Sequence, residues 1–262
     1  MSRMKIARAG MAGLALATAM FTLTDVANAQ GVTIQQATLG EPNQKTAEVS
    51  TEELRRILAD GSAIVLDSRK RAEYVASHIP GARNAAPRPG APISEFVAEV
   101  ERLVGGDKTR ALVLYCNGPF CQASKRLSDQ LLAAGFTNVR RYQLGIPVWR
   151  ALGGVTEIEL DGIVRIFNVD RTAVFLDART AEEFLAGSLP GARNIPLDAV
   201  HSGGLEKAAA GLLPTEDFNT RIVVFGRDAG RARALAEAIV RVARHNVSYF
   251  PSTFDTLRTA IK

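Results

Sequence analysis

The sequence predicts an α/β protein with two similar domains, each a mainly parallel sheet flanked by helices. Two observations lead there. Residues 66–84 return as residues 176–194, with ten of nineteen positions identical at an offset of 110 residues. A period this long exceeds that of solenoid repeats, so each copy should be a complete folding unit. Short apolar runs also alternate with amphipathic stretches, which is typical of parallel strands covered by helices on both faces.

The N-terminal segment has the layout of a secretory signal peptide. Three basic residues precede an apolar stretch over residues 9–23, which is short for a membrane span. Ala27-Asn28-Ala29 then supplies small residues where a signal peptidase reads the chain. We expect a signal peptide over residues 1–29, cleavage after Ala29 and a periplasmic or extracellular protein without membrane attachment. The alternative is an uncleaved membrane anchor. Residues 30–47 are interpreted as a linker.

The charge pattern argues against nucleic-acid binding. The whole chain carries a net charge of +5, and removing residues 1–29 lowers it to +3. The remaining basic residues are interspersed with acidic ones and lack aromatic interleaving, unlike a surface that follows phosphates. The sequence leaves the oligomeric state open.

The first copy opens with an amphipathic helix. Ser50 is placed to cap it, and Glu53 three residues later is placed to complete a capping box. Asp60-Gly61 should end the helix, and residues 63–66 form a short strand that is apolar on both faces. The buried stripe of the helix consists of Leu54, Ile57 and Leu58.

A second strand is predicted over residues 112–115, followed by a loop with glycine and proline and then another helix, which Gly135 stops. Residues 173–176 and 222–225 repeat the two strands in the second copy. The boundary is expected near Gly153-Gly154. We therefore divide the chain into a first module, residues 48–152, and a second module, residues 155–262.

Both copies carry the same motif after their first strand. The first copy reads Asp67-x-Arg69, Glu73-Tyr74 and His78-Ile79-Pro80-Gly81-Ala82, and the second reads Asp177-x-Arg179, Glu183-Phe184 and Leu189-Pro190-Gly191-Ala192. This pattern resembles the rhodanese (sulfurtransferase) family. The segment from Leu144 to Trp149 also resembles the closing element of that family. The resemblance implies two tandem rhodanese-like domains.

The resemblance also implies a catalytic cysteine at the end of the second strand, where Cys116 stands. A cysteine between a strand end and a helix start faces backbone N–H groups and the positive end of the helix dipole, which favour a thiolate and an anionic persulfide. The implied reaction takes sulfane sulfur from a small donor such as thiosulfate and passes it to a thiol or cyanide, without a cofactor. The substrate-binding loop would consist of Asn117, Gly118, Pro119, Phe120, Gln122, Ala123 and Ser124.

Three features of this chain differ from the pattern of the family. The loop contains no lysine or arginine, so an anionic donor would need Lys125, Arg126 or Arg150. The first copy is two residues longer than the second between its second strand and Asn138. Gly226 replaces the cysteine in the second copy, which therefore has no nucleophile. The second loop either holds an anion through Arg227 and Arg231 or belongs to a scaffold that shapes the first module.

Cys121 is the other cysteine of the chain, and three roles are open to it. It forms a structural disulfide with Cys116, as an exported setting permits. It resolves a persulfide or sulfenate formed on Cys116. Otherwise it is a bystander at the helix start.

The acidic and basic residues of the repeated motif are interpreted as a structural ion-pair network, because they recur in the copy that lacks a cysteine. His78 is replaced by Ser188 in the second copy and has no histidine nearby in sequence, so we expect neither a metal site nor a catalytic histidine. Trp149 is expected in the core. The motif residues are Asp67, Arg69, Glu73, Asp177, Arg179 and Glu183.

Three function classes follow from the sequence. The first is a sulfurtransferase that works through a persulfide on Cys116. The second is a thiol redox enzyme or oxyanion reductase that uses Cys116 and Cys121. The third is a binding module without turnover.

Overall fold

The computed structural model describes residues 43–261. The expected signal peptide, residues 1–29, and residues 30–42 of the expected linker lie outside the described residues. Within the described range, no helix is both long and apolar enough to cross a membrane.

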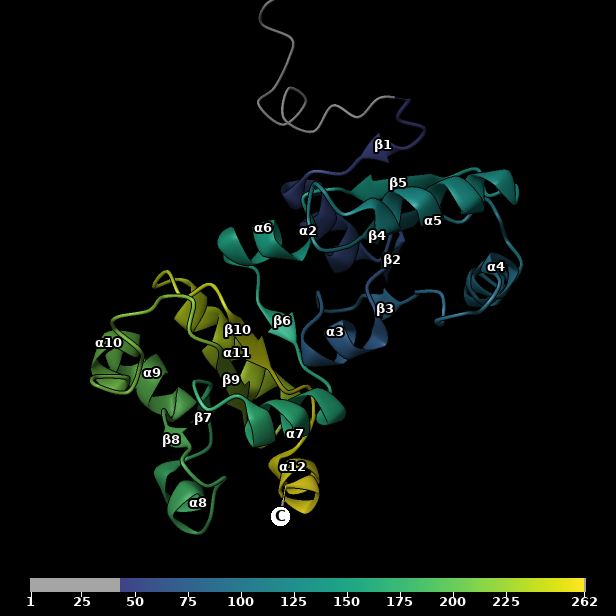
Figure 1. Cartoon of the computed structure of the whole chain (residues 1–262). Helices are drawn as coiled ribbons and strands as arrows, with labels where there is room; N and C mark the ends of the chain where they lie inside the picture. The colour runs from purple at the N-terminus through teal and green to yellow at the C-terminus, as the bar shows by residue number, and fades with distance from the viewer. Residues whose placement is uncertain (1–42, 262) are drawn as a thin grey trace, which may run out of the picture. The chain divides into compact units, whose positions relative to one another are not determined.

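Two five-stranded sheets form the framework, one in each module (Figure 1). Their strand orders are β1-β5-β4-β2-β3 and β6-β10-β9-β7-β8, so the second sheet repeats the order of the first. Every pair of neighbouring strands is parallel. The predicted fold class is therefore confirmed. The strands are β1 Ala47–Glu48, β2 Ile64–Asp67, β3 Arg83–Asn84, β4 Leu112–Tyr115, β5 Val139–Tyr142, β6 Thr156–Glu157, β7 Val174–Asp177, β8 Arg193–Asn194, β9 Ile222–Phe225 and β10 Val247–Tyr249.

Helices cover both faces of the first sheet. Leu54 and Ile57 of one helix pack with Val113 of β4 on one face, and Phe96 and Leu131 of two others pack on the opposite face. Because both faces are covered, β4 is buried at each of its four positions. The helices of the first module are α2 Thr51–Asp60, α3 Arg71–Ala76, α4 Ile93–Leu103, α5 Gln122–Ala133 and α6 Gly145–Ala151.

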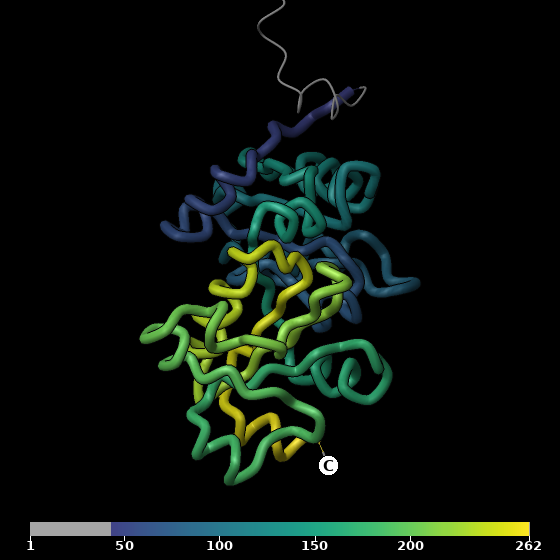
Figure 2. The backbone as a smooth tube through the Cα atoms, turned by 90° about the vertical axis from the view of Figure 1, so that its left-hand side faces the viewer, coloured from purple at the N-terminus to yellow at the C-terminus, as the bar shows by residue number. Residues whose placement is uncertain are grey.

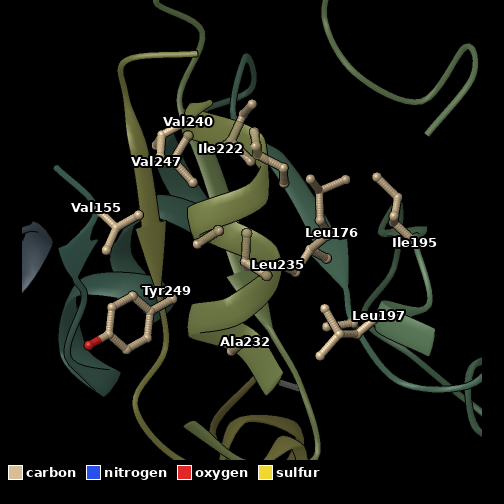
Figure 3. Close-up of a cluster of buried hydrophobic side chains, with 14 of the residues drawn as sticks. Val155, Leu176, Ile195, Leu197, Ile222, Ala232, Leu235, Val240, Val247 and Tyr249 are labelled. Carbon is tan, nitrogen blue, oxygen red and sulfur yellow. The ribbon is translucent and has the colours of Figure 1, made fainter. Parts of the chain in front are cut away.

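The second sheet is covered in the same way. Figure 3 shows Ala232 and Leu235 of the helix α11 between Tyr249 of β10 and Leu176 of β7, and these side chains belong to one buried cluster. Ile163 and Leu257 pack on the other face of that sheet. The helices of the second module are α7 Leu160–Val169, α8 Ala181–Leu185, α9 Leu197–Gly203, α10 Leu205–Ala208, α11 Ala229–Val240 and α12 Phe254–Ala260.

The ends of α2 follow the sequence signals with one exception. Ser50 caps the helix by accepting a hydrogen bond from the N–H of Glu53, and Gly61 ends it in the left-handed conformation with φ of 67°. The expected capping box is wrong in its second half. The Glu53 carboxylate binds Arg140 of β5. A full positive charge brought close by the sheet offers that carboxylate a stronger partner than a backbone N–H.

The two extra residues of the first copy lie in the loop after β4. The buried positions of α5, from Ser124 to Leu131, match those of α11, from Ala232 to Ile239, at a constant offset of 108 residues. Strands β4 and β9 match at an offset of 110 residues. The difference is therefore confined to the connection between strand and helix. Figure 2 traces the backbone through both modules, from teal in the first to green and yellow in the second. The first module thus has the longer loop at its cysteine.

Candidate active site

Cys116 follows the last residue of β4, at the carboxyl end of the first sheet. Its side chain is buried, and its carbonyl oxygen accepts a hydrogen bond of 3.1 Å from the N–H of Ile146 at the start of α6. A disulfide joins Cys116 to Cys121, with Cα atoms 6.4 Å apart. Because of this bond, Cys121 is not a bystander, and two of its three roles remain: a structural bridge or the partner in a reactive pair. The disulfide has to be reduced before Cys116 can act as a nucleophile.

The loop after Cys116 leads directly into α5. The N–H of Cys121 donates to the carbonyl of Gly118 over 3.0 Å, and the Asn117 amide donates to the Glu73 carboxylate over 2.6 Å. Phe120 is 90% exposed at the tip of the loop. The predicted loop residues Gln122, Ala123 and Ser124 form the first turn of α5.

Cys121 occupies the N-cap of α5 and makes no capping hydrogen bond with its side chain. The first-turn N–H groups of a helix have no acceptor within the helix and carry its positive dipole end. In the first module this end stands five residues from Cys116 without a capping side chain.

Gly145 holds α6 against the loop. A Cβ atom at this position would lie 2.4 Å from the Cys116 carbonyl oxygen and 2.5 Å from the Gly118 nitrogen, and its φ is 65°. Both the close approach and the left-handed backbone require glycine here. Gly145 lies in the segment that resembles the closing element of the family, but its contact with the cysteine loop was not predicted. The sequence held one signal for this role, because the counterpart of Gly145 at the offset of 108 residues is Thr253, so this glycine occurs only in the copy with the longer loop.

In the corresponding loop of the second module, the polar groups already bind carboxylates of the same module. Asp228 caps α11 by accepting a hydrogen bond from the N–H of Arg231, at the place where α5 has no side-chain cap. The Arg231 guanidinium donates to Asp198 over 2.7 Å. Arg227 donates to Glu183 over 3.0 Å, and this hydrogen bond is the main reason that the pKa of Glu183 falls to about 2. Because these arginines bind carboxylates of the same module, an external anion would have to displace them.

The repeated Asp-x-Arg motif forms a buried ion pair under each loop. Arg69 donates to both carboxylate oxygens of Asp67 and to the carbonyl of Ser77, and Arg179 repeats these contacts with Asp177 and Gly187. Burial by itself would lower the pKa of Arg69, but the hydrogen bond to Asp67 and the nearby negative charges, that of Asp67 first, together outweigh burial and raise it. The network thus ties the end of the first strand to the turn before the Pro-Gly motif in both modules.

The two modules complete this network with different hydroxyl groups. Tyr115 donates to Asp67 over 2.6 Å and accepts from the N–H of Ile79. Burial, followed by the charge of Asp67, raises the pKa of Tyr115 well above its ordinary value, so the phenol remains a donor. In the second module Phe225 stands at the position of Tyr115, and Ser188 donates to Asp177 over 2.7 Å instead. The exchange preserves a donor for the buried carboxylate.

Comparison with known protein families shows to which family the chain belongs. The family described as "Rhodanese-like domain" matches residues 50–152 and 165–254, which is most of the chain. The chain belongs to the rhodanese-like family. It has two tandem rhodanese-like modules, as the sequence motif indicated.

Individual relatives match only parts of the chain. The HTH-type transcriptional regulator Rv0324 of Mycobacterium tuberculosis is 32% identical over 115 residues, which are 44% of this chain and 45% of the regulator. A thiosulfate sulfurtransferase from Pseudomonas aeruginosa is 24% identical, covering 78% of this chain and 43% of its own, with a TM-score of 0.36. The Alr3790 protein from Anabaena sp. is 28% identical over 41% of this chain and 89% of its own, with a TM-score of 0.35. The chain spans less than half the length of the first two relatives.

The three cations considered for anion binding lie in different surroundings of the rhodanese-like first module. Arg126 is exposed on α5, and Lys125 beside it is half-buried. Arg150 is half-buried and donates to the Ser77 hydroxyl. Burial, with the nearby charges of Arg221 and Arg69, lowers the pKa of Arg150 to about 10. None of the described contacts joins the Arg150 guanidinium to the cysteine loop. Arg126 follows the loop closely in sequence and has no ion-pair partner among the described residues.

His78 and Trp149 take part in contacts within the fold. The His78 ring stacks on Tyr74 and lies 3.2 Å from the Glu157 carboxylate, while its backbone pairs with that of Glu157. Trp149 is buried and donates from Nε1 to the carbonyl of Val155. In the described part of the chain, no group of three or more His, Cys, Asp or Glu side chains is placed to hold a metal ion.

Proposed function

We propose that this rhodanese-like protein is an exported sulfurtransferase that moves sulfane sulfur from a small donor such as thiosulfate to a thiol or cyanide through a persulfide on Cys116. One observation carries the proposal. Cys116 directly follows a buried strand of the first module and leads through a loop to a helix N-terminus without a capping side chain, whereas Asp228 caps the equivalent helix of the second module. The N-terminal segment with Ala27-Asn28-Ala29 supports export.

The reaction begins with reduction of the disulfide. Two molecules of a small thiol reduce the bond between Cys116 and Cys121 and leave as their own disulfide. The Cys116 thiolate then attacks the outer sulfur of thiosulfate, the S–S bond of thiosulfate breaks and sulfite leaves. An acceptor thiolate attacks the outer sulfur of the persulfide, which gives the acceptor persulfide and restores the Cys116 thiolate. With cyanide as acceptor the product is thiocyanate.

Cys121 gives the persulfide a second exit. Its thiolate attacks the Cys116 sulfur of the persulfide, the hydrosulfide ion leaves, and the disulfide seen in the structure forms again. In this role Cys121 limits the lifetime of a persulfide that finds no acceptor.

The same disulfide supports a second candidate, a thiol redox enzyme or oxyanion reductase. In that reaction the two thiolates supply both electrons and end as the disulfide, while the substrate is reduced. The two candidates differ in whether sulfur from the donor remains on the protein.

Mass spectrometry of the reduced protein separates the two candidates. The chain starting at Gln30 is reduced, freed from reductant, incubated with thiosulfate and digested. We expect the mass of one added sulfur on the Cys116 peptide, its loss in Cys116→Ser, and a longer-lived adduct in Cys121→Ser. Donor-driven disulfide formation in the wild type with no adduct in Cys121→Ser would favour the redox enzyme. Reduced thiols that stay unchanged with thiosulfate and other sulfane donors would refute the sulfurtransferase.

A further inference from the structure

Ser68 lies directly beside Cys116. Asp67 and Tyr115 are register partners at the ends of β2 and β4, and the N–H of Ser68 donates to the carbonyl of Tyr115 over 2.9 Å. The next residues along the two strands are Ser68 and Cys116. Neighbouring strands are about 4.8 Å apart, so the two residues stand at adjacent strand ends about one such spacing from each other.

The Ser68 hydroxyl is buried without a hydrogen-bond partner. The residue is 4% exposed, and its Oγ finds no partner in the part of the chain that the structure describes. Burying a hydroxyl without a partner is unfavourable, so such a group in a folded protein calls for a physical reason. A ligand that supplies the missing partner is one such reason.

Comparison of the two modules shows that the fold does not need this hydroxyl. At the position of Ser68 the second module has Ala178, which is fully buried in the same place beside its sheet partner. Asp67 and Arg69 on either side of Ser68 recur in the second module, whereas Ser68 and Cys116 are replaced together by Ala178 and Gly226. The Ser68 hydroxyl is therefore present in the module that has the cysteine and absent from the module that has only the structural motif.

Ser68 also lines a cavity of about 280 Å³ at the start of α5. The walls are mostly apolar, and the cation among the lining residues is Arg126, which is exposed and has no ion-pair partner among the described residues. The cavity is small by comparison with pockets for drug-sized ligands, which hold roughly 300–1,000 Å³. The lining residues are Ser68, Pro87, Ile93, Ala123, Arg126, Leu127 and Gln130.

We propose that this cavity binds the acceptor of the sulfur, a small aliphatic thiol with a carboxylate or sulfonate at its other end. The inference rests on the sulfurtransferase proposed above. The Ser68 hydroxyl donates a hydrogen bond to the acceptor sulfur, the apolar walls cover its methylene groups, and Arg126 pairs with its anionic end. Held against Ser68, the thiolate lies beside Cys116 and attacks the outer sulfur of the persulfide. The S–S bond to Cys116 breaks, the acceptor becomes a persulfide, and Cys116 leaves as a thiolate.

The kinetic test compares three thiols of similar length in the reduced protein. They are 2-mercaptoethanesulfonate, 2-mercaptoethanol and cysteamine, which differ in charge at the end away from the sulfur. Loss of one hydrogen bond in Ser68→Ala should raise KM for all three thiols by roughly 3- to 10-fold. The rate of sulfur loading from thiosulfate, measured in the same variant, separates this effect on the acceptor from any effect on the donor. Ala178 shows that alanine is tolerated at this position of the fold.

Charge at Arg126 should act on the thiols selectively. Arg126→Gln should raise KM for 2-mercaptoethanesulfonate by roughly 3-fold, an effect that salt weakens, and leave 2-mercaptoethanol unchanged. Arg126→Glu should reverse the preference and favour cysteamine. The matched control is Arg56→Gln, since Arg56 is also exposed but lies on α2, which covers the opposite face of the sheet. Equal KM values for each thiol in Arg126→Glu and in the wild type would overturn the site.

A binding measurement keeps the two proposals separable. The probe 2-(methylthio)ethanesulfonate has no thiol and cannot accept sulfur, and its binding is followed by NMR shifts of the Ser68 and Ala123 amides in the reduced protein. We expect binding that Ser68→Ala and Arg126→Glu weaken. Sulfur loading on Cys116 without binding of the probe would overturn the acceptor site and leave the sulfurtransferase standing. Binding of the probe without sulfur loading would overturn the sulfurtransferase and the acceptor role with it.

Discussion

Replacing Gly145 by alanine should damage the first module far more than the same change at Gly153. Both glycines have positive φ, 65° and 77°, so alanine at either position loses roughly 1–2 kcal/mol from the left-handed backbone. At Gly153 nothing lies within 4 Å of the added methyl group. At Gly145 the methyl group meets the backbone of Cys116 and Gly118 at 2.4 Å and 2.5 Å, and backbone atoms cannot yield as a flexible side chain does.

The clash adds to the backbone term. Overpacking a tight site typically costs about 1–3 kcal/mol. We therefore expect Gly153→Ala to lower the free energy of unfolding by about 1–2 kcal/mol from the backbone term alone, and Gly145→Ala by about 2–5 kcal/mol when overpacking is added to it. The variant should also load sulfur on Cys116 more slowly, because the loop has to move away from α6.

The single tryptophan of the chain makes the measurement specific to this module. Trp149 lies on α6 with Gly145, so its fluorescence during urea unfolding reports the first module. Far-ultraviolet circular dichroism of the folded variants serves as the control for secondary structure. If Gly145→Ala and Gly153→Ala unfold at the same urea concentration and load sulfur equally fast, the close approach of α6 to the loop is wrong.

The remaining predictions concern buried polar contacts. Tyr115→Phe removes the hydroxyl that donates to the Asp67 carboxylate and should lower the free energy of unfolding by about 1.5–3 kcal/mol in the same fluorescence assay. The Tyr142 hydroxyl contacts the neutral Thr51, so Tyr142→Phe should lower the free energy of unfolding by only about 1 kcal/mol. An equal loss of stability in both variants would contradict the role of the Asp67 charge. Burial raises the pKa of Glu157, but hydrogen bonds from His78 and Tyr249 outweigh it and leave the pKa below the ordinary value of 4.5. Its charge therefore stabilises the fold above pH 4.5 and loses that effect as the pH falls through the lowered pKa. The Tm difference between wild type and Glu157→Gln should accordingly shrink between pH 6 and pH 3, to about zero when the carboxylate is fully protonated, and a constant difference would refute the assignment.

The local elements of this fold could be predicted because their signals are local. Ser50 and Gly61 end α2 through contacts within four residues, and the apolar run of β4 shows directly that both faces are covered. The repeat at a constant offset predicted two sheets, and the position of Cys116 after the second strand placed the candidate nucleophile. The same comparison showed that the first copy is two residues longer after its second strand, but only the packing of α5 assigned the extra residues to the loop and not to the helix.

The tertiary structure decided which charged and polar groups meet. Glu53 binds Arg140 across 87 residues, and Arg227 binds Glu183 across 44. Such partners depend on the path of the chain between them, which periodicity and capping signals do not contain. The same reason explains why sequence alone left three roles open for Cys121, whereas the fold of the loop over Gly118 brings its sulfur to Cys116. It also explains Ser68, an ordinary residue in the sequence, which parallel pairing of β2 with β4 places beside Cys116.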